Sequence, residues 1–147
     1  MQQRLKWYGS VAMIGAGLLG AAIGLVAQGE TYKARLSALP GDAKTVKDMA
    51  GLGSATATLA GMKLTVNGTF DGLKTNATKV ELHNAVMAGV RGPSIGELTI
   101  TKAMKGTISG TIDLTQPQID HLKKGGLYIQ IYSEKPTDGT LWGWLVR

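Results

Sequence analysis

The 147-residue chain contains no cysteine, which excludes disulfides, thiolate metal sites and cysteine nucleophiles. Aromatic residues make up only 5% of the sequence although 44% is hydrophobic, so its apolar content is mostly aliphatic. No segment interleaves basic and aromatic residues in the manner of a nucleic-acid-binding surface. The net charge of +6 therefore indicates a mildly basic, solvated surface, and we expect no nucleic acid as a partner.

Charge is absent from a 21-residue stretch that runs from Trp7 to Ala27. A helix of this length rises roughly 30 Å, which matches the hydrocarbon core of a bilayer. Arg4 and Lys6 precede the stretch, so the positive-inside rule places the N-terminus in the cytoplasm and residues 30–147 outside it. We expect a single transmembrane helix in residues 1–29 and an extracytoplasmic domain in residues 30–147.

A cleaved signal peptide is the alternative interpretation of this segment, because it also combines basic residues with an apolar stretch. The stretch is longer than a usual signal-peptide core, and cleavage after Ala27 would place Leu25 where a small residue is preferred. We therefore favour an uncleaved anchor. Since an exported domain without disulfides suits a bacterial periplasm, we expect a single-pass protein of the bacterial inner membrane.

Small residues recur every four positions in the apolar stretch, at Ala12, Ala16, Gly20 and Gly24. On a helix they form one strip that lets another helix approach closely, so that van der Waals contact drives association in lipid. This strip predicts packing against an integral membrane partner or a second copy of the chain.

Alternating apolar and polar residues predict eight strands after residue 30. They cover residues 32–38, 54–60, 62–70, 78–83, 97–101, 106–114, 127–132 and 140–146. One helix is expected over residues 115–125, with Thr115 as N-cap and Gly125 as terminator. Many short strands separated by turns predict an all-β antiparallel sandwich with one short helix.

The order of these motifs resembles a CHRD domain, the repeat first named from chordin. The resemblance begins with Tyr32-Lys-Ala-Arg-Leu-Ser-Ala38 and Ala57-Thr-Leu-Ala-Gly-Met-Lys-Leu-Thr-Val66, and continues with Ala77-Thr-Lys-Val-Glu-Leu-His83. It ends with Gly126-Leu-Tyr-Ile-Gln-Ile-Tyr132 and Asp138-Gly-Thr-Leu-Trp-Gly-Trp-Leu145, and so covers about residues 31–146. It implies a Greek-key sandwich like those of immunoglobulin domains or superoxide dismutase, but no particular activity.

CHRD domains often carry a His-x-His pair on the strand that corresponds to residues 80–83, and a further histidine in the strand at 127–132. Here those positions are Glu81, His83 and Tyr132. A structural or catalytic metal needs three or four converging ligands, whereas Glu81 and His83 supply two. We therefore expect no cofactor and no enzymatic activity, and weak metal binding by this pair stays open.

In the last two strands the aliphatic residues take the inward positions, which sends Tyr128, Tyr132, Trp142 and Trp144 outward. Exposed aromatic patches mark protein or membrane contacts. We expect a non-catalytic accessory subunit of a membrane complex, photosynthetic or respiratory, that braces its periplasmic face and contacts membrane subunits and lipid. The alternatives are a free membrane-tethered adhesion or ligand-binding module and, less favoured, a metalloenzyme that resembles superoxide dismutase.

Overall fold

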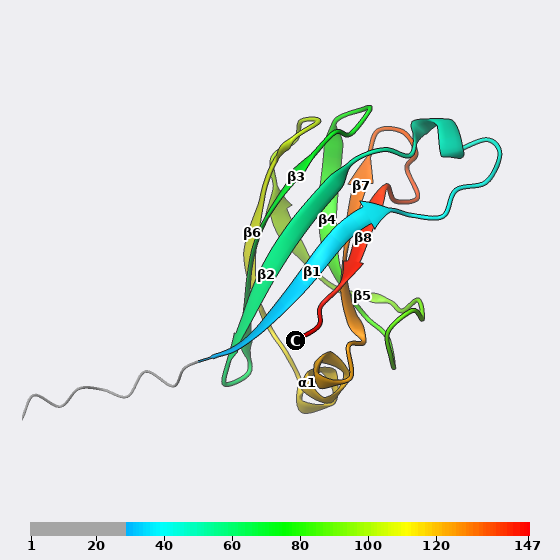
Figure 1. The fold of residues 1–147 in the computed structure, drawn as a ribbon. Helices are drawn as coiled ribbons and strands as arrows, with labels where there is room; N and C mark the ends of the chain where they lie inside the picture. Colours follow the sequence, from blue (N-terminus) through cyan, green and yellow to red (C-terminus); the bar gives the residue numbers. More distant parts are fainter. Residues whose placement is uncertain (1–28) are drawn as a thin grey trace, which may run out of the picture.

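The computed structural model describes residues 29–147, which form eight antiparallel strands, one α-helix and one short 3-10 turn (Figure 1). The strands are β1 (Glu30–Ala38), β2 (Leu52–Ala60), β3 (Lys63–Asp71), β4 (Ala77–Asn84), β5 (Ser94–Ile100), β6 (Gly106–Asp113), β7 (Leu127–Ser133) and β8 (Leu141–Trp144). The helix α1 spans Gln116–Lys123, and the 3-10 turn η1 spans Val46–Asp48. The eight strands and the helix predicted from the alternation of residues and from the capping signals are thus confirmed, with shifts of a few residues at their ends.

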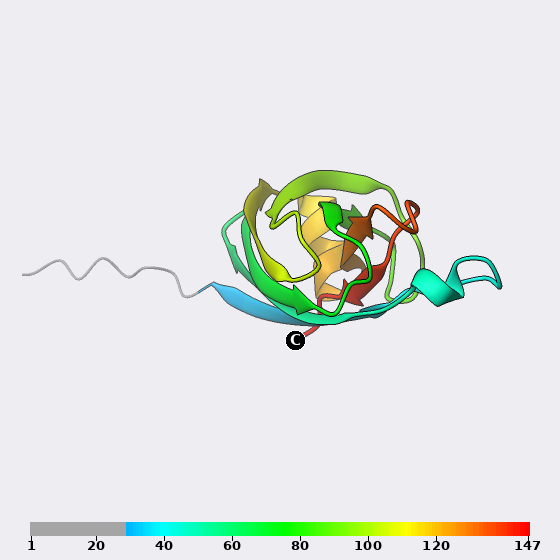
Figure 2. The same ribbon diagram turned by 90° about the horizontal axis from the view of Figure 1, so that it is seen from above.

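The strands form a closed barrel in the order β1-β2-β3-β6-β5-β4-β7-β8, so the predicted sandwich is wrong. Figure 2 shows the strands surrounding a common interior. Two groups of four strands are joined edge to edge at two seams. β5 pairs with β6 through only Thr99–Ser109 and Ile100–Ile108, and β1 pairs with β8 through Ser37–Trp142 and Ala38–Leu141. These short ladders close the barrel by pairing part of each edge strand that a sandwich would leave free.

Glycines at the seams explain why the barrel can close. A Cβ added to Gly143 would lie 2.4 Å from the Arg35 carbonyl oxygen, and one added to Gly110 would lie 2.7 Å from Cδ2 of Leu98. Glycine inside a strand commonly marks a tight bend or a close approach of another segment. Because the alternation of residues does not report which strands lie side by side, it could not distinguish this barrel from two separate sheets.

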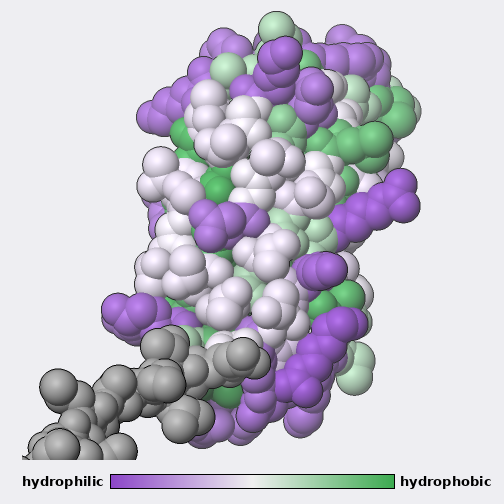
Figure 3. Space-filling model, turned by 60° about the vertical axis from the view of Figure 1, so that its left-hand side comes forward, coloured by the Kyte–Doolittle hydropathy of each residue, from purple (hydrophilic) through white to green (hydrophobic). Residues whose placement is uncertain are grey.

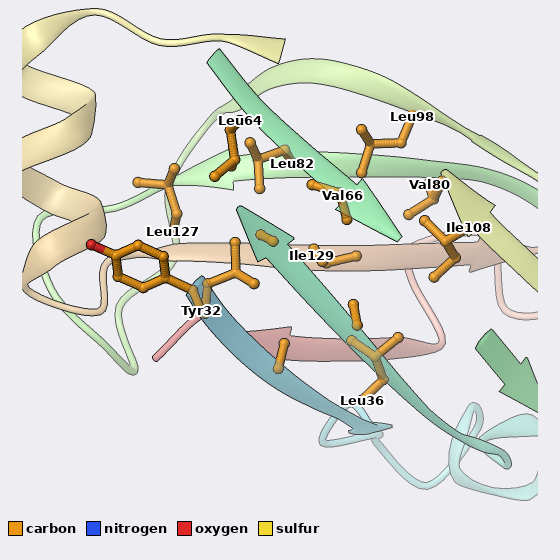
Figure 4. Packing of buried hydrophobic residues seen from close by; sticks show 14 of the residues in the cluster. Tyr32, Leu36, Leu64, Val66, Val80, Leu82, Leu98, Ile108, Leu127 and Ile129 are labelled. Atoms are coloured by element: carbon orange, nitrogen blue, oxygen red, sulfur yellow. The ribbon is translucent and has the colours of Figure 1, made fainter. Parts of the chain in front are cut away.

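The barrel interior is filled by aliphatic side chains from every strand (Figure 4). Leu36, Leu64, Val80, Leu82 and Ile129 are fully buried, as the alternation in their strands predicts. Burying one such side chain contributes about 1.5–3 kcal/mol relative to leaving it in water. With no disulfide present, this core and the strand ladders hold the fold together.

Helix α1 covers the end of the barrel at which β1 begins (Figure 1). Its first turn carries a capping box: Oγ1 of Thr115 accepts a hydrogen bond from the Gln118 amide, and Oε1 of Gln118 accepts one from the Thr115 amide. Ile119 and Leu122 are buried in the core cluster. The helix therefore supplies the apolar cover that this end of the barrel needs.

The outer face of β2, β3 and β6 is polar but largely uncharged. Cross-strand neighbours there are Thr58 and Thr65, Thr65 and Thr111, and Thr69 and Thr107. Figure 3 shows this side as a largely pale surface of intermediate hydropathy, with hydrophilic residues gathered at its two ends and a few between them. It supplies no concentrated apolar or charged patch.

The expected transmembrane segment, Trp7–Ala27, and its strip of Ala12, Ala16, Gly20 and Gly24 lie outside the described residues. Within residues 29–147, no helix has the length and apolar character required to cross a membrane.

Candidate interaction site

The outer surfaces of β4, β7 and β8 bring the four predicted aromatic residues together. Alternation along β7 and β8 turns Tyr128, Tyr132, Trp142 and Trp144 away from the interior, and strand register places Tyr128 beside Trp144. We call these four residues the aromatic face. β4 lies on the other side of β7 and completes the surface by pairing His83 with Tyr128 and Lys79 with Tyr132.

Three rings of the aromatic face, those of Tyr128, Trp142 and Trp144, contact one another directly. The centroids of Tyr128 and Trp144 are 4.3 Å apart, those of Trp142 and Trp144 are 6.0 Å apart, and Tyr128 meets Trp142 edge-on at 6.0 Å. Such pairs contribute about 0.5–1.5 kcal/mol each beyond the area they bury. Tyr128, Trp142 and Trp144 therefore form one connected cluster, and Tyr132 is linked to it through His83, whose ring centroid lies 6.4 Å from that of Tyr132.

Exposure is uneven within this cluster. Tyr132, Trp142 and Trp144 are half-buried, but Tyr128 is only 2% exposed, in contrast to the exposed residue expected from the sequence. The loop 85–93 folds back over Tyr128. The Tyr128 hydroxyl accepts a hydrogen bond from the Gly92 amide at 3.2 Å and donates one to the Gly92 carbonyl at 3.1 Å. Tyr128 thus anchors the loop, and the other three aromatic residues remain accessible to a partner.

His83 lies under the same loop and links it to the aromatic face. Its ring stacks on Tyr128 with centroids 4.8 Å apart. Nδ1 lies 2.9 Å from the Gly92 carbonyl oxygen, which can only accept, so we assign the Nδ1 proton to that bond. Nε2 lies 3.1 Å from the Tyr132 hydroxyl and 3.4 Å from Oε2 of Glu81. Both ring nitrogens of this buried histidine are therefore engaged.

Glu81 is held ionised by its neighbours. The Lys79 ammonium donates to Oε1 of Glu81 at 3.0 Å and also lies 4.4 Å from the ring centroid of Tyr132. Desolvation raises the pKa of Glu81, but its polar neighbours, foremost the hydrogen bond and the charge of Lys79, outweigh it and leave this pKa below its ordinary value. Burial, together with the adjacent Glu81 carboxylate, raises the pKa of Tyr132, so its hydroxyl stays protonated.

This arrangement does not fit a metal site of the kind discussed for Glu81 and His83. In the described part of the chain, no three His, Cys, Asp or Glu side chains converge in a way that could hold a metal. The other histidine, His121, is turned to Asn84, whose Oδ1 lies 2.8 Å from its Nδ1. Lys79 already supplies the positive charge next to Glu81. The polar groups form a closed network, and its effect is to fix the positions of β4, β7 and the loop 85–93.

Arg91 is a member of the site that the sequence reasoning missed. Its guanidinium carbon lies 5.0 Å from the ring centroid of Trp142, in the range of a cation–π contact. Arg91 and Gly92 stand in a glycine-rich loop, and nothing in their local sequence reports that this loop returns to β7 and β8. The only available signal was the Gly92-Pro93 pair, which predicted a loop but not its direction.

A hollow of about 790 Å³ lies away from the aromatic face. It is lined by β2, β3 and the start of β6, with Phe70, Arg35 and Lys105 among its residues. It has neither a buried titratable cluster nor a histidine, so we do not assign it a chemical role.

These features define a class of small all-β barrel domains that have a helix over one end and an aromatic face on the outside. The chain belongs to the CHRD domain family, because the family model matches residues 33–145. The resemblance noted in the sequence is thereby confirmed for the barrel, while the expected anchor precedes the matched residues. No curated protein and no solved structure matches the chain.

Proposed function

We propose that the chain is a membrane-anchored, non-catalytic accessory subunit whose aromatic face contacts a partner protein of a membrane complex. The observation that carries this proposal is the pair Trp142 and Trp144, which lie side by side, partly exposed and bordered by Arg91. Tryptophan, tyrosine and arginine are the residue types that dominate binding energy at protein interfaces.

The rigidity of the aromatic face supports the same role. Trp144 rests on the buried Tyr128 ring, which is held in turn by His83 and the Gly92 backbone. A partner that binds pre-positioned rings loses little side-chain entropy at the interface. The site is therefore suited to a stable contact with a protein surface.

Residues 1–28 supply the anchor in this proposal. Their uncharged 21-residue stretch is long enough to span a bilayer, and the basic residues Arg4 and Lys6 before it favour a cytoplasmic N-terminus. The barrel then lies on the periplasmic side of a bacterial inner membrane. The strip from Ala12 to Gly24 would add a helix contact with the same complex.

The test compares the wild-type chain with the double variant Trp142→Ala/Trp144→Ala, both at full length and extracted from their native membrane in mild detergent. We expect the wild-type chain to migrate with a larger assembly on a native gel, and the double variant to migrate alone. A matched control, Thr65→Ala/Thr111→Ala, changes exposed residues on the other side of the barrel and should leave migration unchanged.

Thermal unfolding of each variant shows whether its barrel is intact, and Trp142→Phe/Trp144→Phe keeps two rings in place if the alanine variant is too unstable. Unchanged co-migration of a folded double variant would refute the proposal. A wild-type chain that extracts as a clean monomer would favour the free membrane-tethered module instead.

A further inference from the structure

The barrel has one end from which the chain leads back toward residue 28, and we call it the basal end. It comprises Gly29, the turn between β2 and β3, helix α1, the loop 85–93 and residues 145–147. A shared hollow brings Gly29 together with Met62 and Ile119, and a Cβ added at Gly125 would lie 3.6 Å from both Ala88 and Val146. Figure 1 shows these segments gathered at the lower end of the barrel.

Exposed apolar side chains concentrate at the basal end. Eight large hydrophobic residues are exposed in the described part of the chain, and five of them lie here: Met62, Val86, Met87, Val90 and Val146. Three belong to the single loop 85–93. This loop contains no acidic residue, and Arg91 lies near its C-terminal end. Exposed apolar residues gathered in this way indicate a surface that meets something other than water.

Basic residues stand beside this apolar group. Lys123 and Lys124, at the C-terminus of α1, and Arg147 line a hollow of about 250 Å³ together with Tyr32, Ala88 and Val146. Arg147 is paired with Glu30, whereas neither lysine forms an ion pair within residues 29–147. Apolar side chains with adjacent unpaired lysines are the combination by which peripheral surfaces bind anionic lipid headgroups.

The length of the connection limits what the basal end can face. Only Gln28 and Gly29 separate Ala27, the last residue of the apolar stretch, from Glu30 at the start of β1. Three Cα–Cα steps span at most about 11 Å. The polar headgroup region on each side of a bilayer is roughly 5–8 Å deep. If residues 7–27 cross the membrane, the basal end must therefore lie at or within the headgroup layer.

We propose that the basal end docks on the anionic headgroup layer, with Val86, Met87 and Val90 inserted among the lipids and Lys123 and Lys124 against their phosphates. This inference rests on the anchor of the proposed function but concerns a different surface from the aromatic face. Docking of the basal end fixes the orientation of the barrel relative to the membrane. The aromatic face, which lies on the barrel wall, then points parallel to the membrane plane, toward a neighbouring subunit.

The absence of native cysteine permits a direct test with single labelled positions. Met87→Cys at the basal end and Met104→Cys at the opposite end are matched, with exposed fractions of 56% and 51%. Strands of this length hold the two ends roughly 25 Å apart. Each full-length variant carries one environment-sensitive fluorophore and is reconstituted in phosphatidylcholine vesicles with or without phosphatidylglycerol, containing a headgroup-attached spin quencher.

We expect strong quenching at position 87 and little at position 104, and we expect the quenching at 87 to increase with phosphatidylglycerol. Lys123→Gln/Lys124→Gln should weaken docking on the anionic vesicles, by about fivefold in the docking equilibrium for each lysine removed. Lys102→Gln/Lys105→Gln, which removes two exposed lysines beside Met104 at the opposite end, is the control and should not weaken it.

Co-flotation with the vesicles is measured on the same samples and reports membrane anchoring separately from docking of the basal end. A chain that floats with the vesicles but shows equal quenching at positions 87 and 104 would refute docking while leaving the anchor intact. A chain that does not float would overturn the anchor and the docking with it. Quenching at 87 that is independent of both phosphatidylglycerol and the two lysines would overturn the assignment of anionic lipid.

Discussion

Substitution of Gly92 by alanine tests the link between the loop 85–93 and the aromatic face. An added Cβ would lie 1.9 Å from the Asn84 carbonyl oxygen, a backbone atom that cannot move without disturbing the end of β4. The loop must shift, and three hydrogen bonds of the Gly92 backbone, one with His83 and two with Tyr128, are lost.

Each of these hydrogen bonds contributes about 1 kcal/mol, so the free energy of unfolding should fall by about 3 kcal/mol. For a domain of this size the midpoint of thermal unfolding falls roughly 4 °C per kcal/mol, which gives a decrease of about 12 °C. The midpoint is measured by far-UV circular dichroism on the full-length chain in detergent. The near-UV signal should also decrease, because Tyr128 packs 4.3 Å from Trp144 and is released with the loop.

Gly89→Ala is the matched control in the same loop. Gly89 has a φ of +81° with open space around it, so alanine there is disfavoured by roughly 1–2 kcal/mol but displaces no neighbour. Its near-UV signal should match that of the wild-type chain. If Gly92→Ala keeps its near-UV signal and unfolds no earlier than Gly89→Ala, the loop does not hold Tyr128 and His83 as described.

Three further predictions concern the seam, the polar network and the helix. Gly143→Val should lower the free energy of unfolding by about 3 kcal/mol or more, measured by urea denaturation, since its side chain would meet the Arg35 carbonyl at the β1–β8 seam. Because the pKa of Glu81 is lowered in the folded protein, its stabilising effect is present above the ordinary value of 4.5 and is lost as the pH falls below it. Glu81→Gln should therefore flatten the acid limb of a stability–pH curve. Thr115→Ala should remove the capping box and lower the unfolding free energy by about 1 kcal/mol in the same urea assay.

Each of these predictions has a result that contradicts it. A Gly143→Val variant as stable as the wild-type chain would show that the seam tolerates a side chain. An unchanged acid limb for Glu81→Gln would mean that the carboxylate makes no net contribution to the fold. Equal stability of Thr115→Ala and wild type would show that the cap is replaced by water.

The local sequence was sufficient to predict the strands, the helix and the side of each strand that faces the barrel interior. Leu36, Val80 and Ile129 are buried as the alternation in their strands predicted, and α1 is capped at Thr115 as expected, because its capping residues Thr115 and Gln118 are close in sequence. These features depend on residues a few positions apart. The same alternation correctly turned Trp142 and Trp144 to the outside of the barrel.

Features that depend on contacts between segments far apart in the chain, such as barrel closure and the burial of Tyr128, could not be predicted from local sequence. Closure of the barrel rests on Gly143 meeting Arg35, more than a hundred residues earlier in the chain. The burial of Tyr128 depends on Gly92, which is 36 residues away. Sequence patterns therefore placed the aromatic residues on one face but could not show that a loop covers one of them and adds Arg91 to the others.

The position of β1 has a mechanical consequence. Its ladder with β2 runs from Glu30–Leu59 to Ser37–Leu52, and its other edge meets β8 and the Lys33–Val146 bridge. The hydrogen bonds of both edges lie across the strand, so tension that enters at Gly29 along β1 shears them together and does not open them one after another. A pull applied to the chain just before β1 would thus be shared over the whole ladder, and the barrel would resist extension at that point.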